Sequence, residues 1–243
     1  MFIPLPKYYK PLFSQLLLCL LFLQACSAAA ILPLPPLPSG VIQKDTGNSW
    51  EISPSGTPQV GLVFYPGGLV SPDAYLPLLA PLAEKGVKVL ITKPFLNLAV
   101  FDPEAALAIA KKEPQLKWFL AGHSLGGAMA VKAAKKEPSL FAGLALLGAY
   151  ADKNDAMPEL SLPVLSISAS LDGLSTPTKI AAAKGYLPAS TQYLVIEGGN
   201  HAQFGNYGPQ QGDGKASIDA ASQQQQTRDA LLKMIFPAPK PQP

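Results

Sequence analysis

The sequence has little of the chemistry on which thiol enzymes and metal sites depend. It contains two cysteines, Cys19 and Cys26, and both lie within the first 26 of its 243 residues. The rest of the chain therefore has no thiol for a disulfide, a zinc site or a cysteine nucleophile. The chain also has only two histidines, so we expect no metal site and no metal cofactor.

Charge is scarce as well, since Asp, Glu, Lys and Arg make up 14% of the residues and the formal net charge is +3. The basic residues are scattered, apart from pairs such as Lys111 and Lys112 at expected helix ends. We therefore expect no nucleic-acid partner. Hydrophobic residues, in contrast, make up 48% of the chain, which is enough for the core of one domain.

The N-terminus has the order of a secretory signal. Lys7 and Lys10 precede an apolar run over residues 16–23, and small residues follow over 25–30. Leu-Gln-Ala-Cys, ending at Cys26, resembles the lipobox of bacterial lipoproteins, in which the cysteine is lipidated. We favour export with a lipid anchor at Cys26. The alternatives are cleavage within residues 28–30 and retention as an uncleaved anchor.

The remaining chain divides into three parts. Residues 31–48 include a proline-rich run that predicts an extended spacer between the membrane and the domain. Residues 49–236 form the predicted domain, and residues 237–243 a disordered tail. The sequence leaves the oligomeric state open.

Within the domain, short apolar runs alternate with helical patterns. Strands are expected over residues 50–53, 60–65, 88–92, 116–121, 140–147, 164–168 and 191–197, and helices over 71–84, 102–112, 125–136 and 217–235, with a further helix starting at 176. This alternation predicts an α/β fold with a mostly parallel central sheet and helices on both faces. The glutamine run over residues 223–226 is expected on the exposed face of the last helix.

The segment Gly122-His123-Ser124-Leu125-Gly126 matches the GxSxG nucleophile elbow, a strained turn that presents a serine between a strand and a helix. The motif alone is weak evidence, because a serine before a helix is often only a cap. Its context strengthens it, since an apolar strand ends just before it and an alanine-rich helix begins just after it. We therefore predict that Ser124 is a nucleophile.

A serine hydroxyl needs a base, and His201 is the candidate because His123 is the variable residue of the elbow and should point away from the serine. His201 directly follows an apolar strand, at the edge where the other strands also end.

A carboxylate should orient this imidazole, and in this fold the chain order is serine, acid, histidine. Asp172 fits that order, with a turn-forming role as its alternative. Asp152 and Asp155 follow the preceding strand and are less favoured, and Glu197 is a backup.

Two backbone N–H groups should stabilise the negative oxygen of the reacting acyl group. One is expected from Leu125 and the other from Gly68, with Leu69 as second choice, in the turn after the strand over residues 60–65. This glycine-rich turn has neither the GxGxxG spacing nor the Lys-Ser or Lys-Thr pair of a phosphate-binding loop.

Four segments, FYPGG at 64–68, GHSLGG at 122–127, SLDGLS at 170–175 and GGNHAQFG at 198–205, resemble the α/β-hydrolase superfamily, and in particular a small bacterial branch of it. The resemblance spans residues 60–235. It implies a triad of Ser124, Asp172 and His201, no cofactor, and an ester or related acyl substrate.

Two features bear on the substrate. Only residues 149–162 separate the strand after the elbow from the next one, so we expect no large lid. The glycine-rich segment 204–216 is long enough to wall a pocket. Leu69, His123 and Tyr207 are the predicted substrate contacts. The predicted function is ester hydrolysis on a small molecule, with acyl transfer, thioester cleavage or a non-catalytic binding lipoprotein as alternatives.

Overall fold

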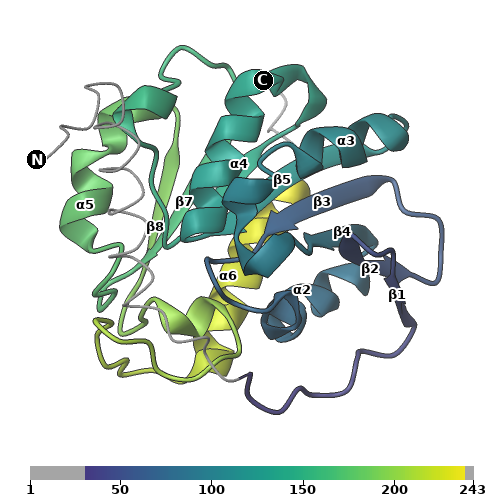
Figure 1. Cartoon of the computed structure of the whole chain (residues 1–243), viewed down its shortest axis with the longest axis horizontal. Helices are drawn as coiled ribbons and strands as arrows, with labels where there is room; N and C mark the ends of the chain where they lie inside the picture. The colour runs from purple at the N-terminus through teal and green to yellow at the C-terminus, as the bar shows by residue number, and fades with distance from the viewer. Residues whose placement is uncertain (1–30, 239–243) are drawn as a thin grey trace, which may run out of the picture.

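The computed structural model describes residues 31–238, which fold around one eight-stranded sheet (Figure 1). The predicted targeting segment, the lipidation of Cys26 and most of the predicted tail lie outside these residues. No helix within residues 31–238 is long and apolar enough to cross a membrane.

The sheet has the strand order β1-β2-β4-β3-β5-β6-β7-β8. β1 and β2 form an antiparallel edge, β2 pairs antiparallel with β4, and the remaining neighbours are parallel. The strands are β1 (Val41–Asp45), β2 (Ser49–Pro54), β3 (Val60–Tyr65), β4 (Val87–Thr92), β5 (Lys117–His123), β6 (Leu144–Leu147), β7 (Val164–Ala169) and β8 (Gln192–Ile196). The predicted mostly parallel sheet is therefore confirmed.

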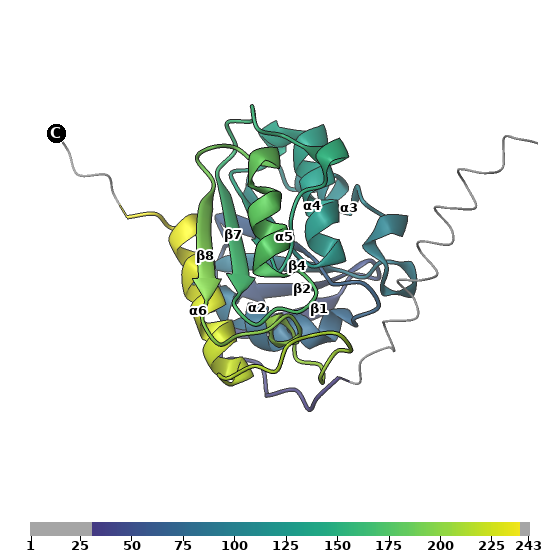
Figure 2. The same ribbon diagram turned by 90° about the vertical axis from the view of Figure 1, so that its left-hand side faces the viewer.

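Helices cover both faces of this sheet because its central strands are apolar on both sides. α2 (Leu76–Ala83) and α6 (Ala220–Ile235) share one buried cluster with the sheet, and α3 (Ala105–Lys112) and α4 (Leu125–Lys136) share the other. The short helix α5 (Pro177–Ala182) lies on the same side as α4 (Figure 2). The fold is thus the predicted three-layer α/β arrangement.

The connection after β6 carries no large lid. Residues 148–163 join β6 to β7, and their only helical element is the three-residue 3-10 helix η6 (Lys153–Asp155). The carboxyl ends of the parallel strands are therefore not covered by an inserted helical domain, as the short spacing predicted.

The segment predicted as a spacer packs against the domain. β1 lies within residues 31–48, and the Leu32 N–H donates to the Asn206 carbonyl oxygen at 3.1 Å. Ile31 also forms an isolated β-bridge with Tyr207. The spacer expectation is corrected here, because leucines between the prolines give this stretch apolar contacts that a free linker lacks.

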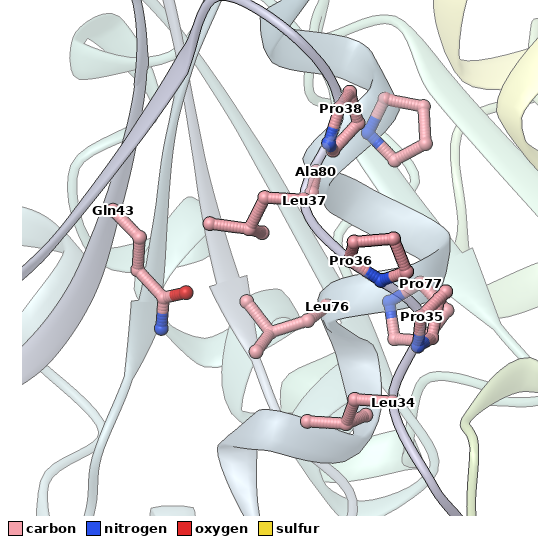
Figure 3. Close-up of a pocket in the computed structure, with 10 residues that line it drawn as sticks. Leu34, Pro35, Pro36, Leu37, Pro38, Gln43, Leu76, Pro77 and Ala80 are labelled. Atoms are coloured by element: carbon pink, nitrogen blue, oxygen red, sulfur yellow. The ribbon is translucent and has the colours of Figure 1, made fainter.

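Figure 3 shows how this segment runs beside α2. A pocket of about 150 Å³ is lined by Leu34 and Leu37 of this segment and by Leu76 and Pro77 of α2. It contains none of the candidate catalytic residues.

The glutamine run of α6 also differs from its expectation. Gln223 and Gln224 are buried, whereas Gln225 and Gln226 are exposed. The helix turns about 100° per residue, so a four-residue run spans both of its faces. Buried glutamines need hydrogen-bond partners, and theirs lie in the functional region described next.

Candidate active site

Ser124 occupies the sharp turn between β5 and α4. Its backbone has φ 51° and ψ −122°, a conformation that non-glycine residues rarely adopt. The flanking glycines are required by close packing: a Cβ on Gly122 would lie 2.4 Å from the Gly126 oxygen, and one on Gly126 would lie 2.2 Å from the Tyr65 oxygen. The GxSxG spacing therefore forms a strained turn at this edge of the sheet.

His201 and Asp172 form a buried pair. The His201 Nδ1 lies 2.8 Å from Asp172 Oδ2, and both side chains are inaccessible to solvent. The other carboxylate oxygen, Oδ1, accepts the N–H groups of Leu174 and Ser175 at 2.8 and 2.7 Å. Asp172 is thus fixed by its own turn, and it orients the imidazole so that Nε2 is free to act as an acceptor.

The serine turn and this pair meet at the end of β6. The Ser124 N–H donates to the Leu147 oxygen at 3.0 Å. The next residue, Gly148, has φ 49°, and a Cβ there would lie 3.1 Å from both His201 Nδ1 and Asp172 Oδ2. The His201 Nε2 is buried and has no hydrogen-bond partner within residues 31–238.

The turn after β3 lies against the start of α4. A Cβ on Gly68 would lie 3.0 Å from the Leu125 side chain, so the two residues expected to supply the oxyanion donors are neighbours. The N–H of Leu69 donates to the Asn97 oxygen at 2.8 Å, and that of Gly67 donates to the Tyr75 hydroxyl at 2.9 Å. With both of these amides engaged, the geometry favours Gly68 over Leu69 as the donor from this turn.

His123 is buried beside the pair. Its ring lies 4.5 Å from that of His201, and its Nδ1 lies 2.8 Å from the Tyr75 hydroxyl. Burial, together with the nearby His201, holds the pKa of His123 well below its usual range, so this imidazole is neutral. Burial raises the pKa of Tyr75, which keeps its hydroxyl protonated and able to donate to His123.

The predicted substrate contacts differ in how they are placed. Leu69 is partly exposed next to Gly68, whereas His123 and Tyr207 are 1% and 4% exposed. The Tyr207 ring lies 6.4 Å from that of His123, within the core layer that contains α2 and α6. These two residues therefore support the site from inside and do not present their side chains on an open wall.

The other candidate acids lie elsewhere. Glu197 is exposed, and Asp152 caps the short helix η6 by accepting the Asn154 N–H at 2.8 Å. Asp172 is therefore the carboxylate that the structure pairs with His201. No group of three or more His, Cys, Asp or Glu side chains in the described part of the chain could hold a metal ion.

Asp213 connects the loops that carry the acid and the histidine. Its carboxylate accepts backbone N–H groups from Gly173, His201, Ala202 and Gly214 at 2.8–3.1 Å. Nothing in its local sequence, Gly-Asp-Gly, distinguishes it from a turn residue, so sequence analysis missed it.

Gln223 holds the residue before His201. Its Oε1 accepts the Asn200 N–H at 3.0 Å, and its Nε2 donates to the Asn200 oxygen at 2.8 Å. This pair of hydrogen bonds ties the histidine loop to α6. Helical periodicity in residues 217–235 was the signal that could have placed Gln223 on the buried face.

Comparison with known proteins identifies the family to which this fold belongs. A model of the alpha/beta hydrolase family matches residues 61–227, and the chain therefore belongs to that family. No curated protein matches the chain significantly.

Solved structures with the same fold are distant in sequence. TT1662 from Thermus thermophilus is 15% identical, with a TM-score of 0.58, and the match covers 82% of this chain and 99% of that one. Est1E from Butyrivibrio proteoclasticus, solved with ferulic acid bound, is 14% identical with a TM-score of 0.58, covering 80% and 99%. MGS-MChE2, an alpha/beta hydrolase from a lagoon-sediment metagenome, is 18% identical with a TM-score of 0.55, covering 67% and 90%.

Proposed function

We propose that the protein is a serine hydrolase that cleaves carboxylic esters of small molecules through an acyl-enzyme. The observation that carries this proposal is the buried His201–Asp172 pair at the sheet edge where Ser124 occupies its strained turn. Membership of the alpha/beta hydrolase family supports the reaction class.

In the proposed reaction, the Ser124 hydroxyl attacks the ester carbonyl while His201 Nε2 takes its proton. Asp172 fixes the tautomer that leaves Nε2 unprotonated, and it stabilises the imidazolium that forms. The N–H groups of Gly68 and Leu125 then stabilise the negative oxygen of the tetrahedral intermediate. His201 returns the proton to the departing alcohol. Water then attacks the carbonyl of the acyl-enzyme while His201 takes its proton, and His201 gives that proton to the Ser124 oxygen as the acid departs.

We also propose that the protein is exported and anchored through a lipid on Cys26. The support is the order of charged, apolar and small residues over positions 1–30. Metabolic labelling with an alkynyl fatty acid, comparing wild type with Cys26→Ala, tests this. Equal labelling of the two proteins would contradict lipidation at Cys26.

The catalytic assignment is tested by labelling with a fluorophosphonate probe, which reacts with activated serines. We expect labelling of the wild type, and a loss of at least about 10³-fold in rate for Ser124→Ala and His201→Ala, because nucleophile and base act together. Ester hydrolysis, followed with p-nitrophenyl acetate, should fall in parallel.

Matched controls are available for the serine and the acid. Ser139→Ala changes an exposed serine, and Glu197→Gln changes an exposed carboxylate beside the histidine loop. Both should label as the wild type does, whereas Asp172→Asn should not. A folded wild-type protein without labelling would contradict the hydrolase mechanism and favour a binding function.

A further inference from the structure

An apolar segment lies exposed between β4 and α3. Residues 95–101, with the sequence FLNLAVF, contain no charge, and we call them the apolar loop. Phe95, Leu96 and Phe101 are 71%, 61% and 58% exposed. Grouped exposure of large apolar side chains usually marks a binding surface, since single exposed residues are common but clusters are not.

The apolar loop is held in one shape despite its exposure. Leu96 and Asn97 both have positive φ, at 54° and 55°, a conformation that costs free energy for non-glycine residues. Backbone hydrogen bonds close its two 3-10 turns, η3 (Phe95–Asn97) and η4 (Ala99–Phe101), and Ala99 is fully buried. The Phe95 and Phe101 rings pack edge to face with their centroids 5.8 Å apart.

This loop is attached directly to the turn that carries the proposed oxyanion donor. The Asn97 oxygen accepts the Leu69 N–H at 2.8 Å. A Cβ on Gly68 would lie 3.7 Å from the Leu98 side chain. An acyl carbonyl bound at the Gly68 N–H therefore has the apolar loop as a neighbour.

We propose that the apolar loop binds the apolar acyl group of the ester substrate, with Phe95 and Phe101 as its specificity-determining side chains. This inference rests on the proposed function and specifies its substrate class. The loop contains no charged group that would recognise a polar or ionic alcohol, and its rigid shape reduces the entropy lost on binding. Each acyl methylene that is fully buried would raise kcat/KM up to about fourfold.

The test compares acyl selectivity in the full-length wild type and in a Phe95→Ser, Phe101→Ser double variant. Rates are measured with p-nitrophenyl acetate and p-nitrophenyl octanoate, which share one leaving group. We expect the wild type to prefer octanoate by at least about tenfold in kcat/KM. The double variant should lose most of that preference, because its KM should rise much more for octanoate than for acetate.

Phe236→Ser is the matched control, because Phe236 is also exposed, at 47%, but lies at the end of α6. It should keep the wild-type selectivity. A second series, acetate esters of ethanol and octanol, separates the acyl side from the alcohol side, and the ratio of the two rates should be the same in the double variant and in the wild type.

An unchanged ratio of octanoate to acetate in the double variant would overturn the inference. So would a loss confined to the octanol ester, since the loop would then bind the alcohol. Failure of the proposed function itself looks different: the wild type would hydrolyse neither ester and would not react with the fluorophosphonate probe.

Discussion

Two imidazole rings lie 4.5 Å apart at this site, yet their surroundings give them different chemistry. The His201 Nδ1 lies 2.8 Å from a carboxylate oxygen of Asp172. His123 faces the Tyr75 hydroxyl, which accepts the Gly67 N–H and can donate to Nδ1 only while that nitrogen is unprotonated. The proposed base, His201, and its neutral neighbour, His123, are thus distinguished by one hydrogen-bond partner each.

The neutral state of His123 makes stability depend on pH. Its pKa is lowered in the folded protein by burial and by His201, while the unfolded chain has the ordinary value of 6.5. Below about pH 6.5 the unfolded state therefore binds a proton that the folded state does not, and the free energy of unfolding decreases as pH falls. The loss approaches about 1.4 kcal/mol per pH unit from this residue.

Urea denaturation at pH 7.5 and 5.5 measures this effect. The free energy of unfolding should fall by about 1 kcal/mol more for the wild type than for His123→Asn, which has no proton to take up at that position. Identical pH dependence in the two proteins would show that folding does not lower the pKa of His123.

Among the elements, α6 acts on the site from the opposite side of the sheet edge to α4. Gln223 makes two hydrogen bonds to the Asn200 backbone, and Gln224 donates to the Gly205 oxygen at 3.2 Å. The histidine loop is therefore fixed on both sides of His201. Asp213 adds a third attachment from the following loop.

Replacing Gln223 should loosen the histidine loop. For Gln223→Ala we expect a free energy of unfolding lower by about 1–3 kcal/mol, because the Asn200 N–H and oxygen lose their buried partners. The rate constant kcat should fall about tenfold, with fluorophosphonate labelling slowed but retained. Gln226→Ala is the control, because Gln226 lies three residues further along the same helix and its side chain is exposed. Equal effects of the two variants on stability and kcat would contradict the role of Gln223.

Much of this fold is predictable from local patterns. Val60–Tyr65 and Leu125–Lys136 have the bounds expected from sequence, because an uninterrupted apolar run and an alanine-rich helix between the serine turn and Pro138 are local signals. The fixed order of serine, acid and histidine likewise pointed to Asp172. What local patterns missed are long-range partners: Gln223, Asp213 and Tyr75 act on residues 23, 12 and 48 positions away, and nothing in the neighbouring sequence records these contacts.

At the scale of the whole molecule, residues 31–38 pack against the region around the candidate active site. The Asn206 side chain donates to the Leu32 and Pro33 oxygens at 3.2 Å, and Ile31 pairs with Tyr207 in the loop that follows His201. Leu34 and Leu37 then lie along α2, whose Leu76 is buried. A segment predicted as an extended spacer is thus packed against α2 and against the loop that follows His201.

Removing this segment should therefore destabilise the domain and free the loop that contains Tyr207. We compare a chain that begins at Ile31 with one that begins at Ser39. The shorter chain exposes apolar surface of α2 and loses the hydrogen bonds to Asn206, so its melting temperature should be lower by several degrees, at about 2–4 °C per kcal/mol for a domain of this size. Limited proteolysis should cut residues 205–216 faster in the shorter chain, since loops that lose their anchors open more often.

Equal melting temperatures and equal cleavage rates would show that the contacts of this segment do not stabilise the domain. A spacer would then be the better description of residues 31–38.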